Sequence, residues 1–172
     1  INGANVTITL PTLLNGDVIY VAGGHSLTTA EAGVSTAGYT ELVDFNNGTA
    51  YRFTVSRKRM GATPDTSVVC LGSGDAADGA AYVALCLRGV DPTTQEDATT
   101  TTATGSSTNP NPPSIVTVTN NAWVLPFAGS SVNDGTIVAP SGYGNQVNNN
   151  ANDARDSTVG GATLEKATAG TE

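Results

Sequence analysis

The sequence is poor in positive charge, in aromatic residues and in cysteine. It has 7 Lys+Arg against 15 Asp+Glu, which gives its 172 residues a formal net charge of −8. An acidic chain lacks the general electrostatic attraction that draws proteins to nucleic acid and anionic membranes, so we expect neither as a partner. The sequence also lacks a run of about 20 apolar residues, so it predicts no membrane-spanning helix.

The two cysteines, Cys70 and Cys86, are too few for a disulfide framework. Each lies in an apolar stretch, "SVVCLG" and "YVALCLRG". We interpret both as small buried hydrophobic residues. The alternative, a single bridge between adjacent strands, stays open.

Catalytic and metal-binding patterns are missing as well. His25 is the one histidine, in "GGHS", and no ligand spacing around it predicts a zinc site, so we interpret it as a loop residue. Neither a G-x-S-x-G elbow nor a phosphate-binding glycine loop occurs. Glycosidases use a pair of carboxylates, and Glu41 with Asp44 or Glu96 with Asp97 could form one. A polysaccharide-degrading enzyme is therefore one hypothesis, ranked below the two given at the end of this section. We predict a non-enzymatic protein without cofactor or metal ion.

Glycine, by contrast, is abundant, with 20 residues, and charged residues make up only 13%. A helical protein needs Ala, Leu, Glu, Lys and Arg at exposed positions, whereas this composition is typical of short strands, turns and long loops. "NVTITLP" alternates apolar and polar residues, as a half-buried strand does. "NGDVIYVAGG" has the pattern of a core strand that stops at Gly23-Gly24, before a polar loop.

Further stretches predict strands in hairpins. They are "GYTELVDF" with "TAYRFTVSRKRM", "TSVVCLGSG" with "GAAYVALCLRGV", and "SIVTVT" with "NAWVLPFAGSS", the last turning at Asn120-Asn121. Pro126 predicts an edge strand or a bulge. "NQVNNNANDARDSTVGG" is typical of a polar loop, and "ATLEKAT" of a weak last strand. These about eight to nine strands predict an all-β fold: an antiparallel, jelly-roll-like β-sandwich with long polar loops, formed by residues 1–172 as one domain.

Residues 93–113, "TTQEDATTTTATGSSTNPNPP", form a low-complexity stretch rich in Thr and Pro. It has no apolar period, so we expect a surface loop, called the arm below, that contacts a partner through Pro110, Pro112 and Pro113. Tyr143 in "PSGYG" is a second predicted contact. Trp123 in "NAWVLPF" is predicted to anchor the core.

Arg57, Lys58 and Arg59 stand together in this acidic chain and are called the basic row below. With the period of a strand, the two arginines share the apolar face and the lysine lies on the other face. We expect the row to be a strand end that extends into solvent. A dedicated anion site, and a contact with an acidic neighbour in an assembly, are the alternatives.

Several motifs, taken in order, resemble a β-sandwich domain of structural proteins from tailed phages and prophages, found in head-decoration, fibre and tail-associated proteins. The motifs are "ITLPTLLNGDVIYV", "GYTELVDF", "YRFTVSRKRMGATPDTSV", "AAYVALCLRGVD", "NPNPPSI", "AWVLPFAGS" and "APSGYG". The resemblance covers nearly the whole chain. Because that family usually continues past "AGTE" into a strand with a Trp, we expect its final strand to be absent here or supplied by a neighbour.

The resemblance implies a virion structural protein, a capsid decoration or head-fibre protein exposed on the outer surface of head or tail. Its implied partners are the major capsid protein or other virion proteins, and copies of itself, with a trimer as the favoured homo-oligomer. The alternative is a tail-fibre receptor- or carbohydrate-binding module. That module would bind a host-surface glycan around Tyr39, Tyr51 or Tyr143.

Overall fold

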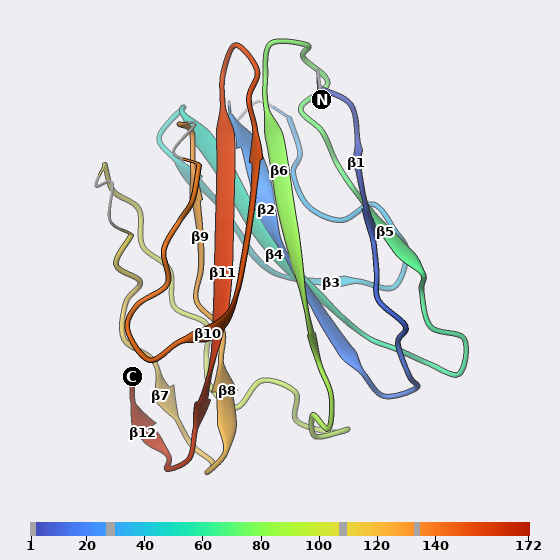
Figure 1. Ribbon diagram of the computed structural model, residues 1–172, viewed down its shortest axis with the longest axis vertical. Helices are drawn as coiled ribbons and strands as arrows, with labels where there is room; N and C mark the ends of the chain where they lie inside the picture. The colour runs from blue at the N-terminus through green and yellow to red at the C-terminus, as the bar shows by residue number, and fades with distance from the viewer. Residues whose placement is uncertain (1–2, 27–29, 107–109, 133–134) are drawn as a thin grey trace.

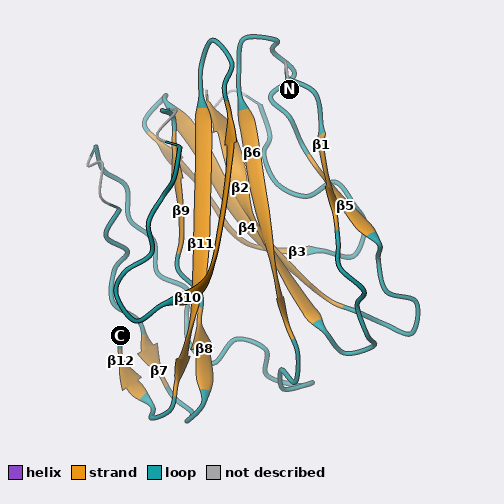
Figure 2. Ribbon diagram, viewed as in Figure 1, coloured by secondary structure: helices purple, strands orange, loops and turns teal. Residues whose placement is uncertain are grey.

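The computed structural model shows strands arranged in layers (Figure 1), and it describes residues 3–26, 30–106, 110–132 and 135–172. Within these ranges the chain forms twelve strands and no helix (Figure 2). The described residues therefore contain no helix that could cross a membrane. All strand pairs are antiparallel, which confirms the prediction of an all-β, sandwich-like fold.

The central sheet has the strand order β3-β4-β2-β6. Its strands are β2 (Val18–Ser26), β3 (Thr40–Asn47), β4 (Tyr51–Arg59) and β6 (Ala80–Leu87). The predicted hairpin of β3 and β4 is confirmed, and the Ala50 amide closes its turn by donating to the Asn47 carbonyl over 3.2 Å.

The second sheet is built around β11 (Ser157–Lys166). One edge of β11 pairs with β10 (Gly144–Ala151), and the other with β8 (Ala122–Val124) and β9 (Phe127–Ser130). Pro126 was predicted to lie in an edge strand or a bulge, and it lies in the break between β8 and β9, where its missing amide hydrogen removes no bond between strands.

The polar loop predicted over residues 145–161 is wrong, because most of it belongs to β10 and β11. Polar residues can be buried in β11 because their side chains find partners. Ser157 Oγ donates to the Gly24 carbonyl over 3.1 Å, and Thr158 Oγ1 donates to the Val132 carbonyl over 2.7 Å.

Two short ribbons complete the fold. β1 (Val6–Thr9) pairs with β5 (Ser67–Cys70), and β7 (Val116–Thr117) pairs with β12 (Gly170–Thr171). Two predicted hairpins are therefore wrong: β5 does not pair with β6, nor β7 with β8. The turn at Asn120-Asn121 does exist, with Asn121 at a φ of 61°, but each strand beside it finds its partner elsewhere in the chain.

Hydrophobic cores lie on both faces of the central sheet. Ile19 and Val21 of β2 pack toward the β1–β5 ribbon. Ala22, on the opposite face, packs in a cluster with Val159 of β11 and the half-buried Phe127 of β9. The ribbon and the second sheet thus cover opposite faces (Figure 1), which explains why every residue of β2 is buried.

β2 continues through Gly23-Gly24, where the sequence predicted its end. Its neighbours come so close that a Cβ on Gly24 would lie 1.8 Å from the Arg52 carbonyl oxygen. Glycine is therefore required for close packing inside the strand. The predicted loop histidine is also wrong, since His25 is fully buried in β2, with ring nitrogens 3.2 Å from the Ser26 and Glu31 carbonyl oxygens.

The two cysteines are free, and only Cys70 is buried, so the prediction of two buried thiols is wrong for Cys86. Burial raises the pKa of the Cys70 thiol to about 12. We expect one thiol per native chain to react with a thiol reagent at pH 8, and the second only after unfolding. Cys86→Ser should remove the native reaction. A native reaction that survives in this variant would contradict the burial of Cys70.

Candidate interaction surface

The basic row lies within the central sheet, not beyond its end. Arg57, Lys58 and Arg59 stand opposite Tyr20, Ile19 and Val18 of β2. The side chains of Arg57 and Lys58 are each only 21% exposed. The expectation that this strand end extends into solvent is therefore wrong.

All seven Lys and Arg side chains bind groups of the same chain. The partners are Glu31 and Asp44 for Arg52, Glu96 for Arg57, Asp65 for Lys58, the carbonyls of Val90 and Asp91 for Arg59, Asp17 for Arg88, Asp75 and Asp78 for Arg155, and Glu172 for Lys166. A contact of the basic row with an acidic partner stays a prediction, and such a partner would compete with these intramolecular contacts.

Arg57 anchors the base of the arm. Its guanidinium bonds Gln95 and forms an ion pair with Glu96. Next along the chain, the Asp97 carboxylate accepts bonds from the Thr119 hydroxyl at 2.6 Å and the Thr119 amide at 3.0 Å. These bonds hold the pKa of Asp97 below its usual range, with the Thr119 hydroxyl as the main cause. The arm therefore leaves the sheet from a fixed position.

We expect Arg57→Ala to release the arm without unfolding the sheets. Limited proteolysis with proteinase K should cut this variant within residues 97–106 about tenfold faster than the native chain, because cleavage follows the population of the open segment. Lys58→Ala is the matched control, since Lys58 is the next residue of β4 but binds Asp65 at 2.7 Å, outside the arm. Equal cleavage in the two variants would contradict the anchoring role of Arg57.

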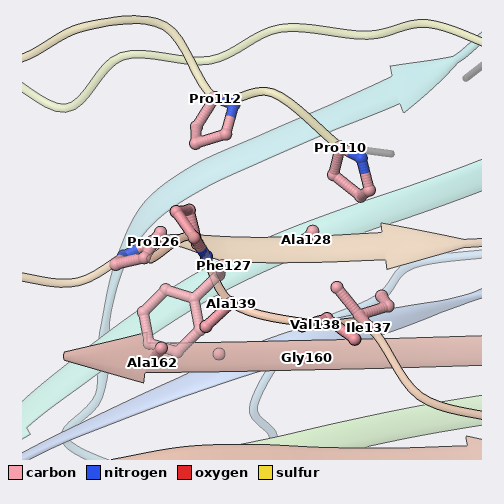
Figure 3. Close-up of a pocket in the computed structure, with 12 residues that line it drawn as sticks. Pro110, Pro112, Pro126, Phe127, Ala128, Ile137, Val138, Ala139, Gly160 and Ala162 are labelled. Atoms are coloured by element: carbon pink, nitrogen blue, oxygen red, sulfur yellow. The ribbon is translucent and has the colours of Figure 1, made fainter. Parts of the chain in front are cut away.

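A small, shallow apolar groove lies on the outer face of the second sheet, where the arm returns across it (Figure 3). Every lining residue is apolar or glycine: Pro110, Pro112, Pro126, Phe127, Ala128, Ile137, Val138, Ala139, Pro140, Gly160, Gly161 and Ala162. The groove thus brings two of the predicted contact prolines together with residues of β9, β11 and the segment before β10.

Polar side chains of β10 hold one wall of the groove. Asn148 Oδ1 accepts the Ile137 amide over 2.9 Å, and Gln146 Nε2 donates to the Ile137 carbonyl over 2.6 Å. Across the groove floor, a Cβ on Gly160 would lie 2.7 Å from Ile137 Cβ. The wall can therefore approach β11 only because position 160 is glycine.

The other predicted contacts lie around the groove or outside it. Tyr143 is half-buried in a turn. Its amide donates to the Pro140 carbonyl over 3.3 Å, and its hydroxyl donates to the Glu172 carboxylate over 3.3 Å. The Pro113 carbonyl accepts the Thr101 hydroxyl over 3.3 Å, and Pro113 does not line the groove. The basic row does not line it either.

The burial of several aromatic side chains differs from the predictions. Tyr51, a predicted sugar contact, is buried between the sheets with its hydroxyl 2.9 Å from Ser157 Oγ. Tyr39 packs partly buried against the core. Trp123, predicted to anchor the core, is 41% exposed on β8. Trp123 is exposed because β8 pairs only with the end of β11, at Glu165 and Lys166. This end lies beyond the apolar part of the sandwich.

Three of the four carboxylates proposed for catalysis, Asp44, Glu96 and Asp97, bind other groups of the chain. Asp44 forms an ion pair with Arg52, which lowers the pKa of that carboxyl, while burial raises the pKa of Glu41. Glu96 and Asp97 anchor the arm, as described above. Within the described ranges, no three His, Cys, Asp or Glu side chains gather where they could hold a metal ion.

Comparison with protein-family models, with curated proteins and with solved structures finds no match to this chain. The resemblance to tailed-phage structural proteins therefore rests on the sequence motifs. The groove itself was missed from sequence, although "TIVAP" and "VGGA" were visible signals. An apolar segment and a run of small residues predict close packing only once their pairing is known.

Proposed function

We propose that the chain is a non-enzymatic structural protein of a tailed-phage particle, a capsid decoration or head-fibre protein on its outer surface. The observation that carries this proposal is the apolar groove with the anchored arm across it. Its lining offers apolar surface for another protein to bury and contains no side chain that could transfer a proton. The motif resemblance supplies the kind of particle.

The proposed partners are the major capsid protein or other virion proteins, and sister copies in a trimer. With a net charge of −8, copies of the chain repel one another, so a trimer must bury apolar surface to be stable. Light scattering after size exclusion tests this part. A mass three times that of the chain supports the trimer, and a monomer at all concentrations rejects it.

Co-sedimentation with capsids from the encoding phage tests the binding role. Val138→Asp should weaken binding about tenfold, since it places a charge in an apolar contact. Val138 is 76% exposed and lines the groove, so the variant should stay folded. Val132→Asp is the control, because Val132 is also exposed but lies outside the groove. Absence of native binding, or equal effects of both variants, would contradict the proposal.

The second candidate is a tail-fibre carbohydrate-binding module, and one observation favours it. The exposed Trp123 ring stands opposite Glu165 in the β8–β11 pair, so an aromatic surface and a carboxylate lie on one face. Sugars bind such sites by stacking and hydrogen bonding. Glycan-array binding that Trp123→Ala abolishes, together with failure to co-sediment with capsids, would favour this candidate over the first.

A further inference from the structure

Within the part of the chain that the structure describes, β7 has a backbone partner, β12, on one edge only. Next to it, Ile115 and Glu172 exchange two backbone bonds, of 3.0 and 2.8 Å. In an antiparallel pair of strands, residue pairs that exchange two backbone bonds alternate with pairs that exchange none. Ile115 with Glu172 is a bonded pair, so the following pair, Val116 with Thr171, is not hydrogen-bonded. The N–H and C=O groups of Val116 therefore point away from β12, and those of Thr171 point to the opposite side.

An open hollow lies beside the β7 segment. Residues 96–101 of the arm line one side, and residues 114–116 with Val118 line the other. Within the described residues, the two segments are joined by side chains near the ends of the hollow. Asp97 accepts the Val118 amide at 2.5 Å and the Thr119 amide at 3.0 Å, and Thr101 donates to the Pro113 carbonyl at 3.3 Å, so the open edge is centred on Val116. No backbone bond between them is found in the described part of the chain.

The side chains at the hollow suit an added strand. Val116 and Val118 are 58% and 73% exposed, so apolar area remains uncovered on both sides of the buried Thr117. Across the hollow lie Thr99, Thr100 and Thr101, whose β-branched side chains favour extended backbone. A strand placed there would gain backbone bonds from Val116 and cover both valines.

We propose that this hollow accepts one extended, basic strand of another protein by β-strand addition to β7. The inference rests on the proposed function only for the premise that the chain works by binding a protein. Charge selects a basic occupant: the chain carries −8, its seven Lys and Arg side chains bind groups of the same chain, and Asp97, which has no cationic partner among the described residues, borders the hollow. A second copy of the chain would bring the same excess of negative charge, and its seven Lys and Arg side chains would have to leave their own partners to bind here.

Val116→Pro tests the proposal, because it removes the N–H that faces the hollow and leaves the bonds between Ile115 and Glu172 in place. Thr171→Pro is the matched control, since it makes the same change in the paired residue on the opposite edge. The probe is a fluorescein-labelled seven-residue peptide of alternating valine and lysine, measured by fluorescence anisotropy. A peptide of alternating valine and glutamate tests the charge preference, and thermal melting checks that both variants are folded.

We expect saturable binding of the lysine peptide, at least tenfold weaker in Val116→Pro and unchanged in Thr171→Pro. Amide exchange at Val116 should slow when the peptide binds. No binding to the native chain, equal binding by the two variants, or preference for the glutamate peptide would overturn the proposal. Self-association that Val116→Pro alone abolishes would overturn the basic partner in favour of a second copy.

Failure of this inference is distinguishable from failure of the proposed function. If Val116→Pro loses the peptide but still co-sediments with capsids as well as the native chain does, the β7 edge is not the capsid contact, and the virion role stands. If the native chain binds the peptide through Val116 but does not co-sediment, the strand site stands and the virion role is rejected.

Discussion

Gly24→Ala should destabilise the protein by about 3 kcal/mol, the upper end of the range for overpacking a well-packed interior. The added Cβ would lie 1.8 Å from the Arg52 carbonyl oxygen and 3.1 Å from Phe53 Cα. These are backbone atoms of β4, so no flexible side chain can move aside. β2 is the central strand between β4 and β6, and relieving the clash requires separating β2 from β4.

Gly61→Ala is the control for this prediction. A Cβ at position 61 would meet nothing within 4 Å. The same change there should be neutral or slightly stabilising, because alanine lowers the entropy of the unfolded chain. Urea unfolding of the two variants gives the comparison. Equal midpoints would mean that β2 and β4 are not packed as closely as described.

Asp17→Asn should produce the second large effect, a loss of stability that depends on pH. Asp17 is 2% exposed, and its carboxylate accepts bonds from Arg88 Nε at 2.9 Å, Arg88 Nη2 at 2.8 Å and the Leu14 amide at 2.8 Å. These bonds, those from Arg88 first, lower its pKa from the usual 3.8 to about 2. An asparagine cannot accept both Arg88 bonds or pair with its charge.

The pH range follows from the direction of that shift. The folded pKa lies below the unfolded one, so the carboxylate stabilises the fold above about pH 4 and loses this effect as the pH falls toward 2. Melting temperatures from pH 7 to pH 2 should therefore show a large difference between the native chain and Asp17→Asn at pH 7 that shrinks in acid. Glu165→Gln, at an exposed carboxylate, controls for the lost charge. A difference that stays constant with pH would contradict the role of the Asp17–Arg88 pair.

Local sequence patterns predicted the positions of several strands. They did not predict which strands pair when the partners are far apart in the sequence. The alternation in Val6–Thr9 and the turn before Tyr51 identified β1 and the β3–β4 hairpin correctly. β5 pairs with β1, more than fifty residues earlier in the chain, and not with the adjacent β6. Hairpin reasoning favours neighbours in sequence and has no means of finding such a partner.

The predicted last strand "ATLEKAT" covers the second half of β11, but the first half, residues 157–161, was missed because its small and hydroxyl residues match a loop by composition. Ser157 and Thr158 are buried only because carbonyls of other segments accept their hydroxyls, and these acceptors were not visible in the sequence. The basic row was misplaced for the same reason, since Glu96, the acidic partner of Arg57, lies in a loop far along the chain. The described parts of the arm, residues 93–106 and 110–113, contain no strand; here the missing apolar period was the signal for a loop.

The most direct test of the account is the protein content of purified phage particles. Particles produced by the strain that encodes this chain would be purified through a density gradient, washed and analysed by quantitative mass spectrometry. We predict that peptides of this chain co-purify at a fixed ratio to the major capsid protein, and that exposed residues such as Val138 stay accessible to external protease. Particles that carry no copies of the chain would contradict the proposal that it is a structural protein of the virion.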